Sequence, residues 1–304
     1  MTDAADFPAR LHVETTSACN QRCRFCTHPT MERTKRHMPV DLFEKIALEA
    51  GSHRARLWLH FLGEPLLHPR IFEMVAFAKR AGAPEVGFST NAVLLTRERV
   101  AELFDSGLDR LEISIDAATA EGYLALRGTD DFAVVTTHVR ALLREKRARG
   151  VARPTITLAF LDAGHDTAER RRFLAEWAPL LDEPDFLMAI PAISFGGAIP
   201  AALPERVREP CHWLFRAALV LSNGDVVTCA TDYRGERVLG NVAREKLADI
   251  WRGETYRELR ARHAIGAYAG VTLCDTCRDW IHSDGRGYVN FSRDERSPRT
   301  RPTE

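Results

Sequence analysis

The chain has 304 residues, 45% of them hydrophobic, which is enough for one large and one small domain, each with a buried core. Lys plus Arg and Asp plus Glu both number 42, so net charge points to neither nucleic acid nor an anionic membrane as a partner. Residues 1–10 contain no apolar run typical of a signal peptide. Residues 186–203 lack charge, but their prolines and a Gly-Gly pair would break a membrane-spanning helix. We therefore expect a soluble, cytoplasmic protein with no membrane or nucleic-acid partner.

Six apolar runs rich in β-branched residues alternate with stretches of helical periodicity, which predicts a parallel sheet of βα units, open or curled into part of a barrel. The expected strands are 10–15, 56–61, 85–89, 110–115, 154–160 and 185–190. The expected helices are 39–50, 70–80, 96–105, 132–149 and 166–181, with a short helical segment around Tyr123.

Chemically distinctive residues follow the first four expected strands. Three cysteines come after the first strand, Gly63-Glu64-Pro65 after the second, Ser89-Thr90-Asn91 at the third and Ser114-Ile115-Asp116 at the fourth. Ligands of such folds bind at the carboxyl ends of parallel strands. The sequence therefore predicts one polar rim that carries the functional site.

The pattern changes after residue 203. Ser222-Asn223-Gly224-Asp225 between two apolar runs predicts a hairpin, and a helix is expected over 247–262. We expect a core domain over 1–203 and a small α+β domain over 204–282. A mobile tail is expected over 283–304, which is rich in Arg, Asp, Ser and Pro.

Seven cysteines in a chain without a secretion signal indicate metal binding rather than disulfides. The first group, Cys19-x3-Cys23-x2-Cys26, places three thiolates within eight residues. Such a set can bind three irons of a cubane and leave the fourth open to a small molecule. Zinc, with His28 as the fourth ligand, is the alternative.

This spacing after a first strand, with Phe25 directly before the third cysteine, resembles the signature of the radical S-adenosylmethionine (SAM) superfamily. The resemblance implies a partial (β/α)6 barrel and a 4Fe–4S cluster whose open iron is chelated by SAM. It also implies a 5′-deoxyadenosyl radical that removes a hydrogen atom from a substrate, and a flavodoxin- or ferredoxin-type electron donor.

The resemblance assigns SAM contacts along the same rim. Gly63-Glu64-Pro65 is similar to a family motif, with Leu62 in place of the first of two usual glycines, and implies that Glu64 accepts from the methionyl ammonium. Arg127 resembles the arginine that pairs with the SAM carboxylate. Taken singly, such residues could also cap helices or form surface ion pairs. The implied SAM contacts are Phe25, Gly63, Glu64, Pro65, Ser89, Asn91, Ser114, Asp116, Arg127 and Ile190.

The second cysteine group, Cys211, Cys229, Cys274 and Cys277, supplies enough thiolates to saturate a cluster. Cys274-x2-Cys277 alone would also suit a zinc ribbon. Residues 211–280 resemble the auxiliary-cluster extensions called SPASM and Twitch. Four cysteines match the shorter Twitch form, which implies one auxiliary 4Fe–4S cluster.

A cluster with four cysteine ligands offers no iron to a substrate, so we expect it to transfer electrons. The spacing most resembles radical SAM dehydrogenases of aminoglycoside antibiotic biosynthesis. This implies oxidation of a secondary alcohol of an aminocyclitol-type small molecule to a ketone, with the auxiliary cluster accepting the electron. A cysteine-quenched epimerase is disfavoured, because the two groups use all seven cysteines.

Several alternatives stay open. They are a decarboxylase or dehydratase of a sugar or nucleoside intermediate, an epimerase with a tyrosine donor, and a peptide maturase. A non-enzymatic iron–sulfur scaffold is weaker, since it has no use for an open site and a SAM ring. The candidates for a catalytic base, at or near strand ends, are His28, His60, Asp162 and His165.

Overall fold

The computed structural model describes residues 5–162, 167–283, 289–291 and 299–300. The strands described form one sheet in the order β11-β10-β6-β5-β4-β3-β2-β1-β7-β8-β9. They are β1 (Arg10–Val13), β2 (Arg56–Trp58), β3 (Val86–Thr90), β4 (Arg110–Ser114), β5 (Thr155–Asp162), β6 (Phe186–Pro191), β7 (Ala217–Val220), β8 (Asp225–Val227), β9 (Val238–Asn241), β10 (Val289–Phe291) and β11 (Arg299–Thr300).

The helices follow the strands in the order expected of βα units. They are α1 (Val40–Ser52), α2 (Ile71–Arg80), α3 (Arg97–Asp105), α4 (Ala120–Arg127), α5 (Phe132–Arg149), α6 (Thr167–Trp177), α7 (Trp213–Arg216), α8 (Leu247–Arg252) and α9 (Glu254–Ala264). The described residues also form the 3-10 turns η1 (His28–Thr30), η2 (Pro65–Leu67), η3 (Ala178–Leu180) and η4 (Asp279–His282).

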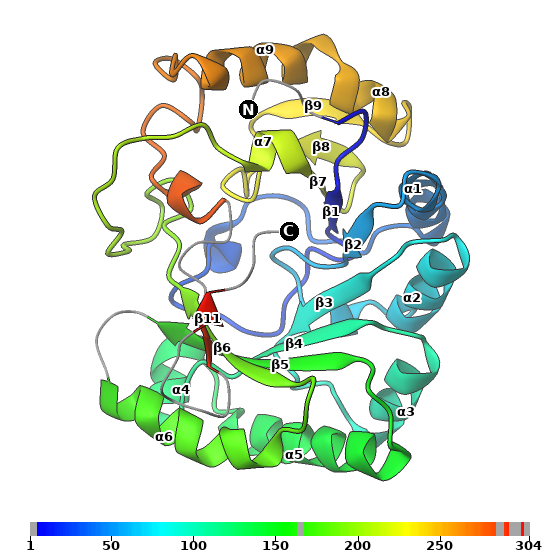
Figure 1. Ribbon diagram of the computed structural model, residues 1–304, viewed down its shortest axis with the longest axis vertical. Helices are drawn as coiled ribbons and strands as arrows, with labels where there is room; N and C mark the ends of the chain where they lie inside the picture. The colour runs from blue at the N-terminus through cyan, green and yellow to red at the C-terminus, as the bar shows by residue number, and fades with distance from the viewer. Residues whose placement is uncertain (1–4, 163–166, 284–288, 292–298, 301–304) are drawn as a thin grey trace.

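The first six strands are parallel, and each pairs with its neighbour in chain order. Helices α1 to α6 cover the outer side of this curved sheet (Figure 1). The main hydrophobic core lies between the two layers, where Leu57, Phe88 and Ile113 of the strands meet Phe43 and Val139 of the helices. The expected partial barrel of βα units is confirmed.

The other face of the same strands is concave and more polar. Successive residues of a strand point to opposite faces. Since Leu57, Phe88, Leu111 and Ile113 pack in the helix-covered core, the residues between them point into the concavity. These residues are Trp58, Gly87, Ser89, Glu112 and Ser114, joined by His12 of β1 and by His60 just beyond β2.

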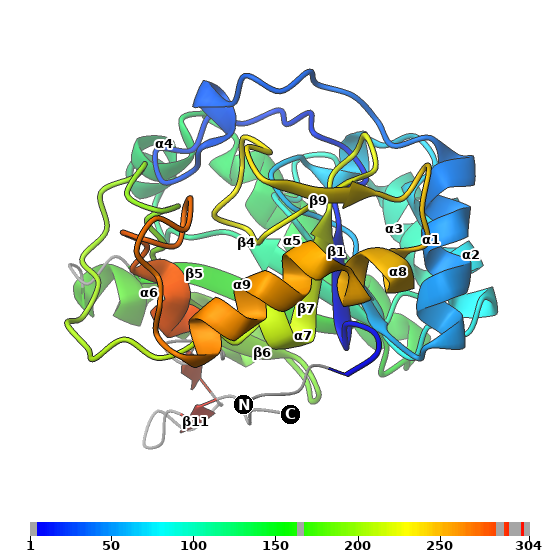
Figure 2. The ribbon, with the colours of Figure 1, turned by 90° about the horizontal axis from the view of Figure 1, so that it is seen from above.

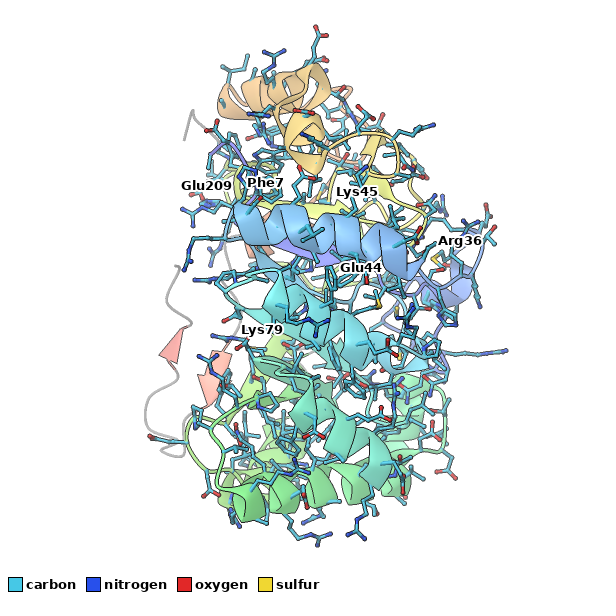
Figure 3. The ribbon with its side chains drawn as sticks, turned by 90° about the vertical axis from the view of Figure 1, so that its right-hand side faces the viewer. Phe7, Arg36, Glu44, Lys45, Lys79 and Glu209 are labelled. Carbon is cyan, nitrogen blue, oxygen red and sulfur yellow. The ribbon has the colours of Figure 1, made fainter. Side chains whose placement is uncertain are left out.

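The C-terminal segment extends the barrel sheet. Strand β7 pairs in parallel with β1, and β8 and β9 follow it antiparallel. Helix α1 lies between α2 and this segment (Figure 3). From α1, Lys45 Nζ donates to Val242 O (2.5 Å), and the Glu49 carboxylate accepts from the Leu247 and Ala248 amides at the start of α8.

One expectation about the C-terminal segment needs correction. The helix expected over 247–262 is two helices, α8 and α9, because the chain is extended at Gly253 (φ −62°, ψ 162°), which caps α9. Figure 2 shows α9 crossing in front of β7. Within the tail over 283–304, residues 289–291 form β10, which pairs antiparallel with β6, and the mobility of the tail stays a prediction.

No helix within the described ranges is both long and apolar enough to cross a bilayer.

A buried ion pair joins the loop after β1 to the C-terminal hairpin. Arg33 donates both terminal nitrogens to Glu14 (2.7 and 2.8 Å) and donates Nε to Tyr233 O (2.7 Å). The Glu14 side chain is fully buried and also accepts from Ser222 N (3.1 Å). The carboxylate therefore holds three segments together where β1 ends.

Replacing Arg33 tests how much the Glu14–Arg33 ion pair contributes to stability. We expect Arg33→Gln to lower the free energy of unfolding by roughly 3 kcal/mol, because it leaves a buried carboxylate without its cation. Urea unfolding followed by circular dichroism measures the loss. Arg36→Gln, an exposed arginine of the same loop, is the matched control, and an equal loss in both variants would contradict the interpretation.

Candidate active site and second cysteine cavity

The loop after β1 brings three thiols together. Cys26 N donates to Cys23 O (3.2 Å), and His28 N approaches Cys26 Sγ at 3.4 Å. Burial raises the pKa of Cys19 to about 12 and that of Cys26 to about 11, and neighbouring thiols add to both shifts. A bound cation such as iron would hold all three as thiolates.

The motif after β2 packs directly on this loop. A Cβ at Gly63 would lie 1.9 Å from Thr16 O, so only glycine allows the close approach, and Glu64 N donates to Ala18 O (2.8 Å). The buried Glu64 carboxylate accepts from Leu66 N, Thr90 Oγ1 and Asn91 N at 2.6–3.0 Å. It thereby caps η2, which begins at Pro65, and anchors the end of β3.

This arrangement gives Glu64 a structural role that the sequence did not indicate. Burial raises the pKa of its carboxyl, and the three donors oppose that shift. The predicted contact with the SAM ammonium stays a prediction. Asn91 donates Nδ2 to Asn20 Oδ1 (2.8 Å) of the cysteine loop, so Asn20 is a rim residue that sequence reasoning missed.

Helix α4 docks its C-terminus on the cysteine loop. The carbonyls of Leu126 and Arg127 accept from Arg24 N (2.9 Å) and Arg22 N (3.3 Å). Gly128 follows in the left-handed region (φ 73°), and a Cβ there would lie 2.7 Å from Arg22 O. Glycine is therefore required here by both conformation and space, and this fixes Arg127 beside the thiols.

The buried Arg127 guanidinium lies at the centre of the rim. Nη1 contacts Gln21 Oε1 (3.3 Å) and Cys23 Sγ (3.6 Å), and Nη2 donates to Ser114 O (2.8 Å). Arg127 also forms a buried ion pair with Asp116, which lies in the left-handed region just after β4 (φ 64°).

The surroundings of Arg127 suit a cofactor that carries a carboxylate. The Nε of Arg127 is buried and has no hydrogen-bond partner within the described part of the chain. Buried N–H groups are almost always satisfied, so this donor is available to a ligand. Phe25 lies beneath the guanidinium, 5.3 Å from Cζ to the ring centroid. Ile190, at the end of β6, is half-buried on the same rim.

Ser89 lies deeper than expected. It is inside β3, where its Oγ donates to Glu112 Oε1 (2.5 Å) and its N donates to His60 Nδ1 (3.1 Å). Glu112, His12 and Trp58 on the concave face were missed from the sequence. Period-two alternation along β1, β2 and β4 could have found them, since each lies directly between two core residues and therefore points to the other face.

The four base candidates differ in surroundings. His28 is buried and its Nε2 contacts Ser17 O (3.0 Å), so it braces the cysteine loop. Burial lowers the pKa of His60 to about 3, and since its Nδ1 accepts a hydrogen bond, Nε2 carries the proton. Asp162 lies at the end of β5, with Arg170 at 3.7 Å. His165 lies outside the described residues.

The second cysteine group lines one cavity of about 130 Å³. Cys211, Cys229, Cys274 and Cys277 all border it, and their mutual proximity adds to the effect of burial in raising the pKa of Cys229 and Cys274. Across the described residues, no three His, Cys, Asp or Glu side chains converge on a single metal ion. A cubane makes no such demand, since each thiolate binds a different iron.

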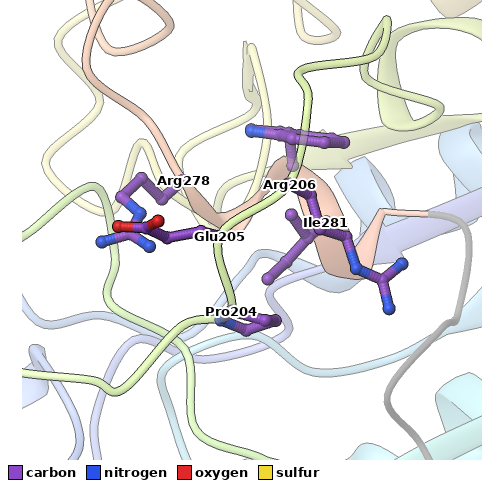
Figure 4. A pocket seen from close by; sticks show the side chains of 6 residues that line it. Pro204, Glu205, Arg206, Arg278 and Ile281 are labelled. Atoms are coloured by element: carbon purple, nitrogen blue, oxygen red, sulfur yellow. The ribbon is translucent and has the colours of Figure 1, made fainter.

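The linker before Cys211 packs on the loop that follows Cys277. Arg278 Nη2 donates to Leu203 O (2.8 Å), and Pro204, Glu205 and Arg206 face Arg278 and Ile281 across a hollow of about 330 Å³ (Figure 4). Ile193 and Phe195, in the uncharged segment 186–203, border the cysteine cavity.

The fold, the three-thiol loop and the four-thiol cavity suit an enzyme with two iron–sulfur sites. Residues 13–162 match the model of the Radical SAM superfamily, and residues 211–278 match the iron-sulfur cluster-binding domain SPASM. The chain belongs to the radical SAM superfamily. Its cofactors are SAM and two 4Fe–4S clusters.

Relatives cover most of the chain. It is 32% identical to a tungsten-containing aldehyde ferredoxin oxidoreductase cofactor-modifying protein of Pyrococcus furiosus, over 88% of each chain. It is 26% identical to the mycofactocin maturase MftC of Mycobacterium tuberculosis, over 90% of this chain and 78% of that one. It is 23% identical to an S-adenosyl-L-methionine-dependent 2-deoxy-scyllo-inosamine dehydrogenase of Niallia circulans, over 88% and 92%.

Solved structures share the fold at low identity. BtrN in complex with AdoMet and 2-DOIA aligns with a TM-score of 0.61 at 18% identity, over 90% of this chain and 93% of that one. SuiB of Streptococcus suis bound to its precursor peptide SuiA aligns with a TM-score of 0.68 at 14% identity, over 84% and 67%.

The role of Arg127 can be tested by SAM binding. We expect Arg127→Lys to weaken SAM binding at least about tenfold, because lysine keeps the charge but loses the forked donors, including Nε. Anaerobic equilibrium dialysis with labelled SAM measures the affinity. Arg140→Lys, which affects a half-exposed pair with Glu176, is the control. Unchanged affinity in Arg127→Lys, with iron content intact, would refute the assignment.

Proposed function

We propose that this enzyme is a dehydrogenase that oxidises a secondary alcohol of an aminocyclitol- or aminoglycoside-type small molecule to a ketone. Cys19, Cys23 and Cys26 hold the SAM cluster in this proposal. Cys211, Cys229, Cys274 and Cys277 hold the auxiliary cluster. The similarity to the 2-deoxy-scyllo-inosamine dehydrogenase, which extends over 92% of that relative, supports the substrate class.

The observation that carries the proposal is the cavity bordered by four cysteines. Four thiolates saturate a cluster and leave no iron for a substrate, so the group there is suited to take up an electron. The two sites together use all seven cysteines of the chain. No thiol then remains to return a hydrogen atom to a substrate radical, which favours net oxidation.

The bound cofactors supply a radical that removes the carbinol hydrogen atom and an acceptor for one electron. The chain must supply a base for the hydroxyl proton. We infer that Glu112 is this base, because its carboxylate lies on the concave face and is held by the Ser89 hydroxyl. His60 Nε2–H is suited to donate a hydrogen bond to the substrate oxygen.

A flavodoxin- or ferredoxin-type protein is the proposed donor to the SAM cluster. The loop that holds the three thiols exposes Arg22, Arg24, Lys35 and Arg36, with Glu32 as its exposed acid. Such a basic surface favours docking of an acidic electron carrier at the cluster it must reduce.

Peptide modification is the second candidate, because the mycofactocin maturase is 26% identical over 90% of this chain. The products distinguish the two functions. With 2-deoxy-scyllo-inosamine as the probe, a dehydrogenase yields one ketone per 5′-deoxyadenosine, measured by mass spectrometry. Deuterium from solvent at an otherwise unchanged carbon skeleton would indicate epimerisation. That outcome, or no product from this probe, would overturn the dehydrogenase proposal.

The metal assignment predicts iron contents. Anaerobically reconstituted enzyme should bind about eight irons, and a Cys19/Cys23/Cys26→Ala variant about four, because the auxiliary cluster has its own ligands. Iron and sulfide analysis measures both. Zinc in place of half the iron would contradict the second cluster.

The base assignment predicts a selective loss of turnover. Glu112→Gln should lower kcat by about 10²–10⁴-fold while SAM affinity stays unchanged, since general-base catalysis contributes that much. Glu85→Gln, which affects the pair with Arg110 on the neighbouring strand, should retain activity. A Glu112→Gln enzyme with normal kcat would exclude Glu112 as the base.

A further inference from the structure

Polar hydrogens without partners surround the four-cysteine cavity. The buried atoms Thr228 Oγ1, His263 Nε2, Trp213 Nε1 and Arg208 Nε have no hydrogen-bond partner among the residues the structure describes, and all four residues line the cavity. A buried polar hydrogen that is left without an acceptor destabilises the folded protein. Four of them around one cavity therefore indicate a bound group that carries several acceptors.

The imidazole of His263 is oriented by a backbone hydrogen bond to one of its two ring nitrogens. Its side chain is 1% exposed, and Cys211 N donates to Nδ1 at 3.4 Å. In a neutral imidazole whose Nδ1 accepts, the hydrogen is on Nε2. The ring packs edge-on against Tyr268, with 4.9 Å between centroids, which fixes its orientation. Nε2–H is thus a pre-oriented donor.

Thr228 presents a second donor to the cavity. It directly precedes Cys229, just beyond β8, and is 1% exposed. The carboxylate that borders the cavity, Asp279, already accepts from Ser194 N (2.6 Å), Ser194 Oγ (2.9 Å) and Gly196 N (2.8 Å). That carboxylate is occupied with the linker, which leaves the cavity-lining donors to the group inside it.

We propose that Thr228 Oγ1–H and His263 Nε2–H donate hydrogen bonds to the sulfur atoms of the auxiliary cluster and thereby raise its reduction potential. The inference rests on the proposed ligation of that cluster by the four cysteines. Reduction adds one negative charge to the cluster, and donors aimed at its sulfurs stabilise the reduced form more than the oxidised form. The two side chains would make the cluster a better acceptor for the electron released by the substrate.

Trp213 and Arg208 also line the four-cysteine cavity. The Trp213 ring also packs against His12 of the concave face, with 4.9 Å between centroids. Arg208 donates Nη1 to Asp275 O (3.0 Å) and Nη2 to Cys274 O, so removing it would disturb the cysteine loop itself. Thr228 and His263 are therefore the better positions for a test, because their side chains make fewer structural contacts.

The test is a redox titration of the auxiliary cluster alone, followed by electron paramagnetic resonance. The full chain with Cys19/Cys23/Cys26→Ala provides a background in which this cluster gives the only iron–sulfur signal. We expect Thr228→Val, which removes the hydroxyl and keeps the shape, to lower the midpoint potential. His263→Leu should lower it too, and His263→Gln, which restores an N–H donor, should recover part of the shift. Thr157→Val, a buried threonine of β5 that does not border the cavity, should leave the potential unchanged.

The outcomes distinguish the hydrogen-bonding role of Thr228 and His263 from the presence of the auxiliary cluster. Unchanged or raised potentials in both Thr228→Val and His263→Leu, with about four irons retained, would overturn the hydrogen-bonding role and leave the cluster in place. A background protein that binds no iron would instead overturn the auxiliary cluster itself. If His263→Leu loses its iron, Thr228→Val alone decides, because valine matches threonine in shape.

Discussion

The parallel pairing of β1 with β7 is the constraint on which the rest of the structure depends. It makes the barrel and the C-terminal segment parts of one sheet, with Arg10 opposite Ala217 and Val13 opposite Val220. The buried Glu14, which follows β1, then holds Arg33 of the cysteine loop and the main chain of Ser222 in the hairpin. Backbone hydrogen bonds and a buried charge, rather than the covalent linker alone, therefore set the positions of the two cysteine groups.

The two sites manage buried polarity in different ways. Beside the three-thiol loop, the Arg127 guanidinium is balanced by Asp116, although burial raises the pKa of that carboxyl. A balanced cation near an open site suits a ligand that brings its own ammonium and carboxylate. Around the four-cysteine cavity, Asp279 instead accepts from Ser194 and Gly196, and donors such as Thr228 Oγ1 and Arg208 Nε remain. Donors that face a closed cavity stabilise added negative charge inside it, which is what an electron acceptor takes up.

The sequence was sufficient for the order of elements and for the rim, because hydrophobic periodicity and the carboxyl ends of strands are local signals. It could not reveal that Glu64 is tied to Thr90 and Asn91, or that Asp116 pairs with Arg127, since those contacts depend on how loops dock. The concave residues His12 and Glu112 were not predicted because they lie inside β1 and β4 rather than beyond the ends of these strands, although period-two alternation marks them. The sequence did not predict that the helix ends at Gly253, because the apolar spacing of α8 and α9 is typical of a single continuous helix.

The antiparallel pairing of β7 with β8 determines where the second cysteine group lies relative to the first. Cys19 lies beyond the carboxyl end of β1. Strand β7 places Leu219 opposite both His12 of β1 and Val227 of β8. Because β8 runs antiparallel to β7, the chain beyond Val227 continues toward the amino end of β1, and Cys229 follows there. A four-residue strand spans about 13 Å. The two cysteine groups therefore lie toward opposite ends of β1. The length of this strand, with His12 packed on Trp213 along it, would separate the proposed radical source from the proposed electron acceptor.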